Sequence, residues 1–292
     1  MLRWRLTLGP LLVAMLIAAA WADVAMPGVW LGIVSLTVVA LASGEAVELS
    51  RAAGLQPVAR LVHAGNFLIV ASAWMPLVWS VGEIPPMGLL FAPAATLTGC
   101  VLAALTFEII GFRAAGQSTR RLAGTIWPLC YVGLLFSFLV LLRSLDPHAA
   151  GVVMLLAMVT VVKLGDTGAY TVGRLVGRHK LAPHLSPGKT IEGAIGGLTF
   201  SAFGAWLVLA WIWPRVVGSA PAPWSEWLPF GILVGAAGMV GDLAESLLKR
   251  DAGAKDSSQW LPGFGGVLDI LDSLLFAAPV AYFFFVRFPP GG

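Results

Sequence analysis

The chain has 292 residues, of which 58% are hydrophobic and 11% are charged. Soluble domains carry about 25% charged residues, so this composition excludes an ordinary soluble globular protein. The net charge of +3 is too small to suggest nucleic-acid binding, and the sequence contains no basic aromatic stripe or nucleic-acid motif. We therefore expect an integral membrane protein, with the lipid bilayer as its surroundings and no nucleic-acid partner.

A membrane-spanning helix needs about 20 mostly apolar residues. Nine segments qualify, at approximately 6–22, 27–44, 64–82, 88–111, 122–142, 149–170, 191–213, 227–248 and 267–286. Pro and Gly residues mark the turns between them. The sequence thus predicts an all-α, polytopic membrane fold of about nine transmembrane helices, in a single membrane domain over residues 1–292. Within it, residues 1–145 form the N-terminal spans and residues 146–292 form the catalytic C-terminal spans.

The first 25 residues resemble a signal peptide, because two arginines precede an apolar run that ends at Ala20-Trp21-Ala22. We favour the alternative of an uncleaved first span, because many more spans follow. Either interpretation leaves residue 23 outside, so the rest of the topology is the same.

Lys and Arg residues fall mainly on one side of the predicted spans. With the N-terminus in the cytoplasm, the inner segments carry fourteen of them and the outer segments only Arg143, Arg215 and Arg287. Cytoplasmic loops of membrane proteins are enriched in Lys and Arg. We therefore expect a multi-pass protein of the inner (cytoplasmic) membrane whose active site faces the cytoplasm.

Three polar patches lie at the predicted inner ends of the C-terminal spans. The first surrounds Asp166, the second covers residues 181–193, and the third covers residues 241–273 between the last two spans. Spacings of three and four residues place several polar side chains of the third patch on one helix face. These are Asp242, Glu245, Ser246 and Lys249 on one helix, and Asp269, Asp272 and Ser273 on the next.

Carboxylates at these positions call for a physical explanation, because a charge at the centre of a spanning helix costs about 2.5–3.5 kcal/mol. Carboxylates placed together repel unless they are protonated or a cation neutralises them. Mg²⁺ prefers one or two carboxylates together with phosphate oxygens and water. We therefore predict Mg²⁺, with a second cation as an option, held by Asp242, Asp269 and Asp166. A turn or capping role for Asp166, and ion pairs of Asp272 with the nearby basic residues, stay open.

Gly188-Lys189-Thr190 follows a proline and precedes the seventh span. A P-loop requires a Gly five residues before Gly188 and a preceding strand, but position 183 is Pro. We reject the P-loop and expect a phosphate cradle at the N-terminus of a helix. A basic loop that only sets the topology is the alternative.

Two long motifs lie within these patches. The first is Asp166 to Tyr170, followed by Leu181 to Gly193. The second runs from Ser246 through Lys249-Arg250 and Lys255-Asp256 to the segment 262–272. Over about residues 160–275, both resemble the signatures of the bacterial phosphatidate cytidylyltransferases, which are also called CDP-diacylglycerol synthases.

The resemblance implies that CTP and phosphatidic acid react to CDP-diacylglycerol and pyrophosphate, a step of phospholipid biosynthesis. It also implies a divalent metal held by the aspartates that match Asp242 and Asp269. We predict that the catalytic residues are Lys189, Lys249, Arg250, Lys255, Asp256 and Asp272. We predict that the substrate-binding residues are Ser186, Lys189, Thr190, Ser246, Lys249, Arg250, Gly265 and Gly266.

Two positions depart from the family pattern. Phe264 replaces the usual His, and Ile270 replaces the usual Arg. Losing a cation beside Asp269 removes a potential phosphate contact, so we expect a divergent member with altered lipid preference or reduced activity.

Three other interpretations stay open at this point. They are a related CTP-dependent lipid transferase or polyprenol kinase-like enzyme, a secondary transporter, and an inactive membrane paralogue. A transporter predicts polar residues near the midplane and often an inverted repeat, whereas the charges here crowd the inner edge. The oligomeric state is open as well, with a homodimer as one option.

Overall fold

The computed structural model describes residues 2–78, 84–113, 115–258 and 265–290 of the chain. These residues form helices and one two-stranded hairpin, which confirms the predicted all-α class. The chain divides into two compact units. Unit 1 comprises Met1–Ser144 and Leu248–Ile270, and unit 2 comprises Leu145–Leu247 and Leu271–Gly292. The single membrane domain over residues 1–292 stays a prediction.

Among the described residues, 8 helical segments are long and apolar enough to cross a membrane. They are Trp30–Ala52, Ala59–Val78, Pro86–Gly111, Ser118–Ser144, Ala149–Val176, Ile191–Val216, Trp224–Asp251 and Leu268–Arg287. The first predicted span is also helical, although its counted apolar stretch, Ala14–Ala25, is shorter. The chain is therefore a multi-pass membrane protein, with a number of spans close to the nine expected.

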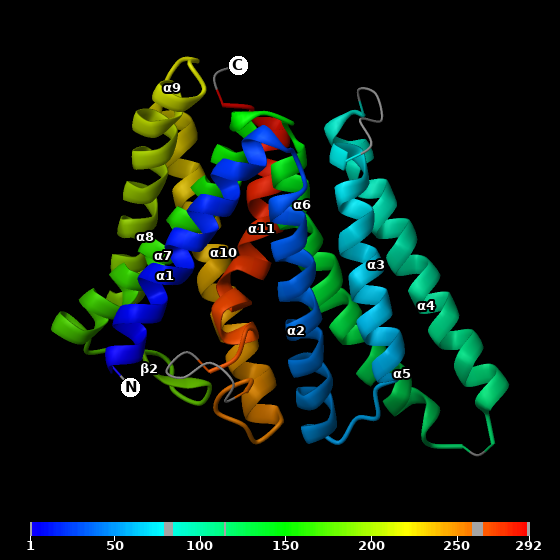
Figure 1. Cartoon of the computed structure of the whole chain (residues 1–292). Helices are drawn as coiled ribbons and strands as arrows, with labels where there is room; N and C mark the ends of the chain where they lie inside the picture. The colour runs from blue at the N-terminus through cyan, green and yellow to red at the C-terminus, as the bar shows by residue number, and fades with distance from the viewer. Residues whose placement is uncertain (1, 79–83, 114, 259–264, 291–292) are drawn as a thin grey trace. The chain divides into compact units, whose positions relative to one another are not determined.

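Unit 1 is a helical bundle in which α3 contacts α2 on one side and α4 on the other (Figure 1). Its helices are α1 (Leu2–Ala25), α2 (Trp30–Ala52), α3 (Ala59–Val78), α4 (Phe91–Gly111), α5 (Ser118–Pro128) and α6 (Leu135–Ser144). A 3₁₀ turn, Pro86–Leu90, precedes α4, and a π-helical turn, Leu129–Leu134, joins α5 to α6. These local 3₁₀ and π turns change the helical geometry without ending the span, which membrane helices tolerate.

A buried ion pair links the first and sixth helices of unit 1. Arg143 Nε lies 2.8 Å from Asp23 Oδ2, and both side chains are 0% exposed. Asp23 also accepts hydrogen bonds from the backbone N–H groups of Gly28 and Leu31, at 3.2 and 3.1 Å. Breaking such a pair leaves an uncompensated buried charge, so this contact ties the α1–α2 turn to α6.

Unit 2 contains the hairpin and most of the C-terminal helices. Its elements are α7 (Ala149–Val176), β1 (Lys180–Ala182), β2 (Ser186–Thr190), α8 (Ile191–Ala205), α9 (Trp213–Val216) and the larger parts of α10 (Trp224–Asp251) and α11 (Leu268–Arg287). A π-helical segment, Trp206–Ile212, joins α8 to α9.

Helices α7 and α8 pack side by side through small residues (Figure 1). A Cβ atom added at Gly168 would meet Phe200 Cγ at 2.5 Å and the Gly196 carbonyl oxygen at 2.8 Å. Small residues allow the close backbone approach that drives helix association in membranes. This packing holds the hairpin between the two helices at a defined place.

Two helices extend beyond their predicted ends. Helix α2 continues to Ala52 rather than residue 44, and α7 continues to Val176 rather than residue 170. Hydropathy detects only the apolar part of a helix, whereas polar residues stay helical when their side chains find partners. As a consequence, Glu45 is a helix residue. Asp166 lies well inside α7, so the alternative of a turn or capping role for it is wrong.

Candidate active site

The β1–β2 hairpin delivers two polar side chains to the start of α8. Lys180 pairs with Thr190 in the antiparallel register, and the Ile191 N–H donates to the His179 carbonyl at 2.9 Å. Thr190 is the N-cap of α8, and its hydroxyl oxygen accepts a hydrogen bond from the Gly193 N–H at 3.1 Å. This geometry confirms that Lys189 and Thr190 precede a helix N-terminus, where the helix dipole favours anions.

Lys189 forms an ion pair with Asp242 of α10. The Lys189 Nζ lies 2.7 Å from Asp242 Oδ2, and the two side chains are 23% and 36% exposed. Beside Asp242, a Cβ at Gly241 would meet the Asp272 carbonyl oxygen at 2.5 Å, so α10 and α11 are in close backbone contact there. Asp242 is therefore held on a rigid support and remains accessible.

A cavity of about 530 Å³ opens beside this ion pair. Cavities of about 300–1,000 Å³ are typical of small-molecule sites. Its lining combines two carboxylates, two cations, a hydroxyl and apolar surface. The residues that matter for the argument are Asp166, Asp242, Lys189, Arg174, Thr190 and Leu181. Such a lining suits a phosphorylated ligand with an associated cation and an apolar part.

Asp166 reaches this cavity from α7 and has a basic partner of its own. Lys163 Nζ lies 3.3 Å from Asp166 Oδ2, one helical turn earlier, and both side chains are part-exposed. Lys163 thus pairs with a predicted metal ligand.

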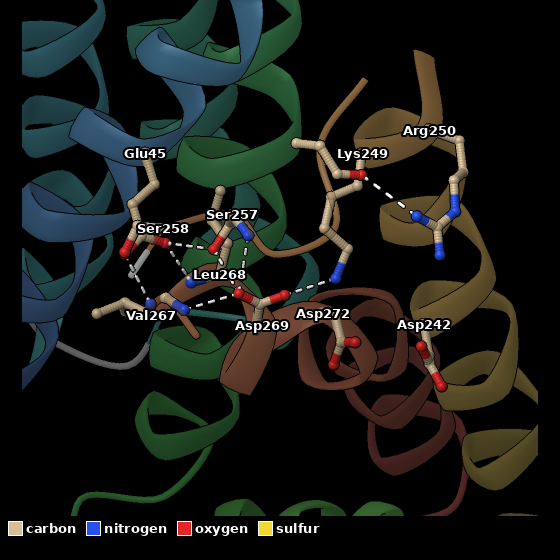
Figure 2. A network of polar contacts seen from close by, with 12 residues as sticks. Glu45, Asp242, Lys249, Arg250, Ser257, Ser258, Val267, Leu268, Asp269 and Asp272 are labelled. Carbon is tan, nitrogen blue, oxygen red and sulfur yellow. Dashed lines mark hydrogen bonds and ion pairs between the residues drawn. The ribbon is translucent and has the colours of Figure 1, made fainter. Parts of the chain in front are cut away.

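A second polar cluster lies in unit 1, where α10 ends and α11 begins (Figure 2). Lys249 Nζ lies 2.5 Å from Asp269 Oδ1, with the side chains only 13% and 10% exposed. Asp269 Oδ2 accepts three hydrogen bonds. They come from Ser257 N at 2.9 Å, Ser257 Oγ at 2.8 Å and Gly266 N at 2.7 Å.

Glu45 of α2 completes this cluster, and Figure 2 shows its carboxylate directed at the same loop. It accepts hydrogen bonds from the hydroxyls of Ser257 and Ser258, at 2.9 and 3.1 Å. It also accepts from the N–H groups of Val267 and Leu268, both at 2.8 Å. The residue is buried and lies 212 positions before Ser257 in the chain. It belongs to the region to which the sequence assigned no role in the site.

Comparison with known proteins shows the family to which the chain belongs. A profile of the cytidylyltransferase family matches residues 5–288. The chain belongs to the cytidylyltransferase family. It is 36% identical over 201 residues to the phosphatidate cytidylyltransferase of Bacillus subtilis, covering 68% of this chain and 67% of that protein. It is 40% identical over 182 residues to that of Brucella suis, covering 60% of this chain and 64% of that protein.

A third member of the cytidylyltransferase family, the phosphatidate cytidylyltransferase of Haemophilus influenzae, is 42% identical over 141 residues, covering 48% of each chain. The aligned regions thus span about half to two thirds of these relatives. The family match extends the similarity to the N-terminal spans, which the sequence motifs did not reach.

The loop between α10 and α11 carries the remaining predicted family residues of unit 1. Lys255 and Asp256 are exposed, and Arg250 donates to the Ala254 carbonyl at 3.4 Å. Gly265 has a positive φ of 87°, and a Cβ there would meet Asp269 Oδ2 at 2.5 Å. Only glycine combines this backbone conformation with so close an approach to the carboxylate.

Three further predicted residues belong to unit 2. Ser186 begins strand β2, and Ser246 is half-buried on α10. Asp272 is buried on α11 and accepts hydrogen bonds from the Ser273 backbone and hydroxyl groups, at 2.5 and 3.0 Å. Their roles in binding and catalysis stay predictions.

The predicted ion shared by Asp242 and Asp269 joins residues of different units, so it stays a prediction. The segment 262–264, with the departure at Phe264, lies outside the described residues. Ile270, the other departure, is half-buried in the first turn of α11. Glu45 is the residue that sequence reasoning missed. The available signal was an acid at the end of an apolar run, followed at once by Ala46 and Val47.

Proposed function

We propose that this chain transfers a cytidylyl group from CTP to phosphatidic acid, forming CDP-diacylglycerol and pyrophosphate for phospholipid synthesis. The family membership and the names of its relatives support a nucleotidyltransferase over a transporter or a polyprenol kinase. The observation that carries the proposal is the cavity of unit 2. There Lys189 and Asp242 form an ion pair at the N-terminus of α8. The excess of Lys and Arg in the predicted inner segments supports a site that opens to the cytoplasm.

The triphosphate of CTP suits the basic side of this cavity. Lys189 supplies a compact positive charge, and Arg174 supplies a planar guanidinium for phosphate oxygens. Backbone N–H groups in the first turn of α8 add donors next to Thr190. In this proposal, Lys249, Arg250 and Lys255 bind the departing pyrophosphate or the lipid phosphate, and Ser186 and Ser246 add hydrogen bonds.

Mg²⁺ fits the acidic side of the same cavity. Among the described residues, no group of three or more His, Cys, Asp or Glu side chains is placed to hold a metal ion. A preformed cage is not required, because Mg²⁺ is usually bound by one or two carboxylates together with substrate phosphates. Asp166 and Asp242 line the cavity and offer those carboxylates. Asp269 belongs to unit 1 and stays a predicted ligand. The ion would neutralise negative charge on the triphosphate.

The residues of the chain then have to position two phosphates. The lipid phosphate oxygen forms a bond to the α-phosphorus of CTP, and the bond from that phosphorus to the β-bridging oxygen breaks. Pyrophosphate leaves with that electron pair. The second pKa of a phosphomonoester is about 6, so the nucleophile is already anionic near pH 7 and requires no strong general base. Alignment and charge neutralisation supply the catalysis.

The lipid has an apolar way into the cavity. Leu181 and Tyr170 line it and are exposed in the structure. Exposed apolar side chains at a membrane edge suit acyl chains, so we propose that phosphatidic acid enters from the inner leaflet with its chains against these residues.

The test measures pyrophosphate released by the purified protein in detergent. We expect release from CTP only when phosphatidic acid and Mg²⁺ are both present, loss of release with EDTA, and recovery with added Mg²⁺. Asp242→Asn should raise the Mg²⁺ concentration needed for half-maximal rate. Thr199→Val, which removes a hydroxyl that donates within α8, is the control.

A panel of other lipids and of dCTP tests the departure at Ile270. If pyrophosphate release depends on a different lipid, that lipid rather than phosphatidic acid is the substrate. No release with any lipid would reject the catalytic proposal.

A further inference from the structure

The site of a cytidylyltransferase is expected in its C-terminal half, yet one of its polar clusters is built on a residue of the second helix. Glu45 is 7% exposed, and each of its carboxylate oxygens accepts two hydrogen bonds from the segment 257–268. Both partners belong to unit 1. A buried carboxylate with all its oxygens satisfied is fixed in position.

Glu45 acts on α11 as a capping residue supplied by another helix. The N–H groups of Val267 and Leu268 lie at the beginning of α11, where the chain's own hydrogen bonds leave donors unsatisfied. A carboxylate there also interacts favourably with the helix dipole. Asp269 lies in that first turn, directly after Leu268.

Ser257 connects the two carboxylates directly. Its hydroxyl oxygen lies 2.9 Å from Glu45 Oε2 and 2.8 Å from Asp269 Oδ2. A hydroxyl has one hydrogen to donate, so the two hydrogen bonds given above for Ser257 Oγ compete for the same hydrogen. The position of Glu45 therefore affects how Asp269 is hydrogen-bonded, and Asp269 in turn pairs with Lys249.

Gly266 shows how tightly this arrangement is closed. A Cβ added there would overlap with Ser257 Oγ and with the Glu45 carboxylate. The second glycine of the Gly265-Gly266 pair is thus required by the close approach of Glu45 and Ser257, and its N–H donates to Asp269.

We propose that Glu45 is a positioning residue of the reaction, which holds Ser257 and the start of α11 so that Asp269 and Lys249 face the phosphates correctly. The proposal rests on the proposed function for its activity readout. Glu45 contacts neither substrate in this proposal, so its loss should lower kcat and leave the KM for CTP nearly unchanged.

The experiment compares Glu45→Gln with Glu48→Gln. Both change an acid to its amide on α2, but Glu48 is exposed. In Glu45→Gln, an NH₂ group replaces a carboxylate oxygen that accepts from two donors. Because the NH₂ group is itself a donor, it cannot accept these hydrogen bonds, and the cluster should open. We expect kcat to fall about tenfold or more, as for losses of residues that orient metal-site groups. The KM for CTP should stay within about twofold, and Glu48→Gln should match wild type.

A purely structural cap would lower the thermal midpoint while kcat per folded molecule stays at the wild-type value, and that result would overturn the proposal. A rise in KM alone would overturn it as well. Ser258→Ala removes the 3.1 Å hydrogen bond to Glu45 and keeps the Glu45 carboxylate. It should show the same kcat pattern with a smaller change, and it tests the proposal if Glu45→Gln folds poorly.

Hydrogen exchange separates this inference from the proposed function. In Glu45→Gln, the amides of Ser257 and Gly266 to Leu268 should exchange faster than in Glu48→Gln, whether or not the wild type is active. Unchanged exchange there rejects Glu45 as the anchor. An inactive wild type with faster exchange rejects only the proposed reaction.

Discussion

Asp269 in unit 1 and Asp242 in unit 2 each pair with a lysine, but the rest of their surroundings differ. Asp269 is 10% exposed and accepts three further hydrogen bonds, two of them from backbone N–H groups. Asp242 is 36% exposed and lines a cavity of about 530 Å³. The first carboxylate is immobilised by the protein, whereas the second is open to a ligand.

This difference teaches that two aspartates, which the family resemblance assigns to one metal, have different physical surroundings. Backbone donors that converge on Asp269 fix the loop between α10 and α11, as preorganised sites require. The Lys189–Asp242 pair presents both charge signs to the cavity, where we propose that Mg²⁺ and phosphate replace the present partners. Substitutions should therefore affect the two regions differently. A change at Asp269 should lower kcat, whereas a change at Lys189 should weaken the binding of CTP.

The largest effect is expected for Asp269→Asn. The change leaves Lys249 without its carboxylate and turns an amide nitrogen or oxygen toward three donors. We expect kcat for pyrophosphate release to fall about 10²–10³-fold, the range seen when one preorganised electrostatic group is removed. The protein should still elute as a folded species in detergent. A fall in CTP affinity with full kcat would contradict the role of Asp269 as a fixed group.

Lys189→Met should have an intermediate effect, because it weakens the binding of CTP. A hydrogen bond to a charged group is worth about 1.5–3 kcal/mol, and 1.4 kcal/mol is a factor of ten, so kcat/KM for CTP should fall about 10–100-fold. Steady-state kinetics over a range of CTP concentrations measure it. Lys180→Met is the matched control, because Lys180 lies in the same hairpin and donates to the Pro187 carbonyl at 2.7 Å. Equal losses in both variants would show that the hairpin, rather than the charge of Lys189, matters.

Asp23→Asn should have the smallest effect on activity and a clear one on stability. The pair with Arg143 is fully buried, and removing one partner costs about 3–5 kcal/mol. We expect a lower thermal unfolding midpoint in detergent, with kcat per folded molecule unchanged. Asp23→Leu combined with Arg143→Leu should recover most of the midpoint, because neither charge is then left alone. A loss of kcat without a loss of stability would assign this carboxylate to the site instead.

Sequence predicted local structure well where residues are close in the chain. Lys189 and Thr190 do precede α8, because Thr before an apolar run is a favoured N-cap residue. The Pro187-Gly188 pair, in contrast, lies in strand β2. The pairing of Lys249 with Asp269 was not predictable, because 20 residues separate them and only the fold of the intervening loop brings them together. Likewise, the hairpin register and the depth of the cavity depend on contacts between distant segments.

The amino-acid sequence alone determined that this protein is a multi-pass, helical membrane protein of the cytidylyltransferase family, because hydropathy and contiguous motifs are local properties of the chain. Only the tertiary structure decided that Glu45, 212 residues before Ser257, anchors the loop that carries Asp269. The physical reason is that a carboxylate at the end of an apolar helix has no visible partner in the sequence. Its partners are two serine hydroxyls and two backbone N–H groups, which every residue except proline possesses, and only folding selects among them.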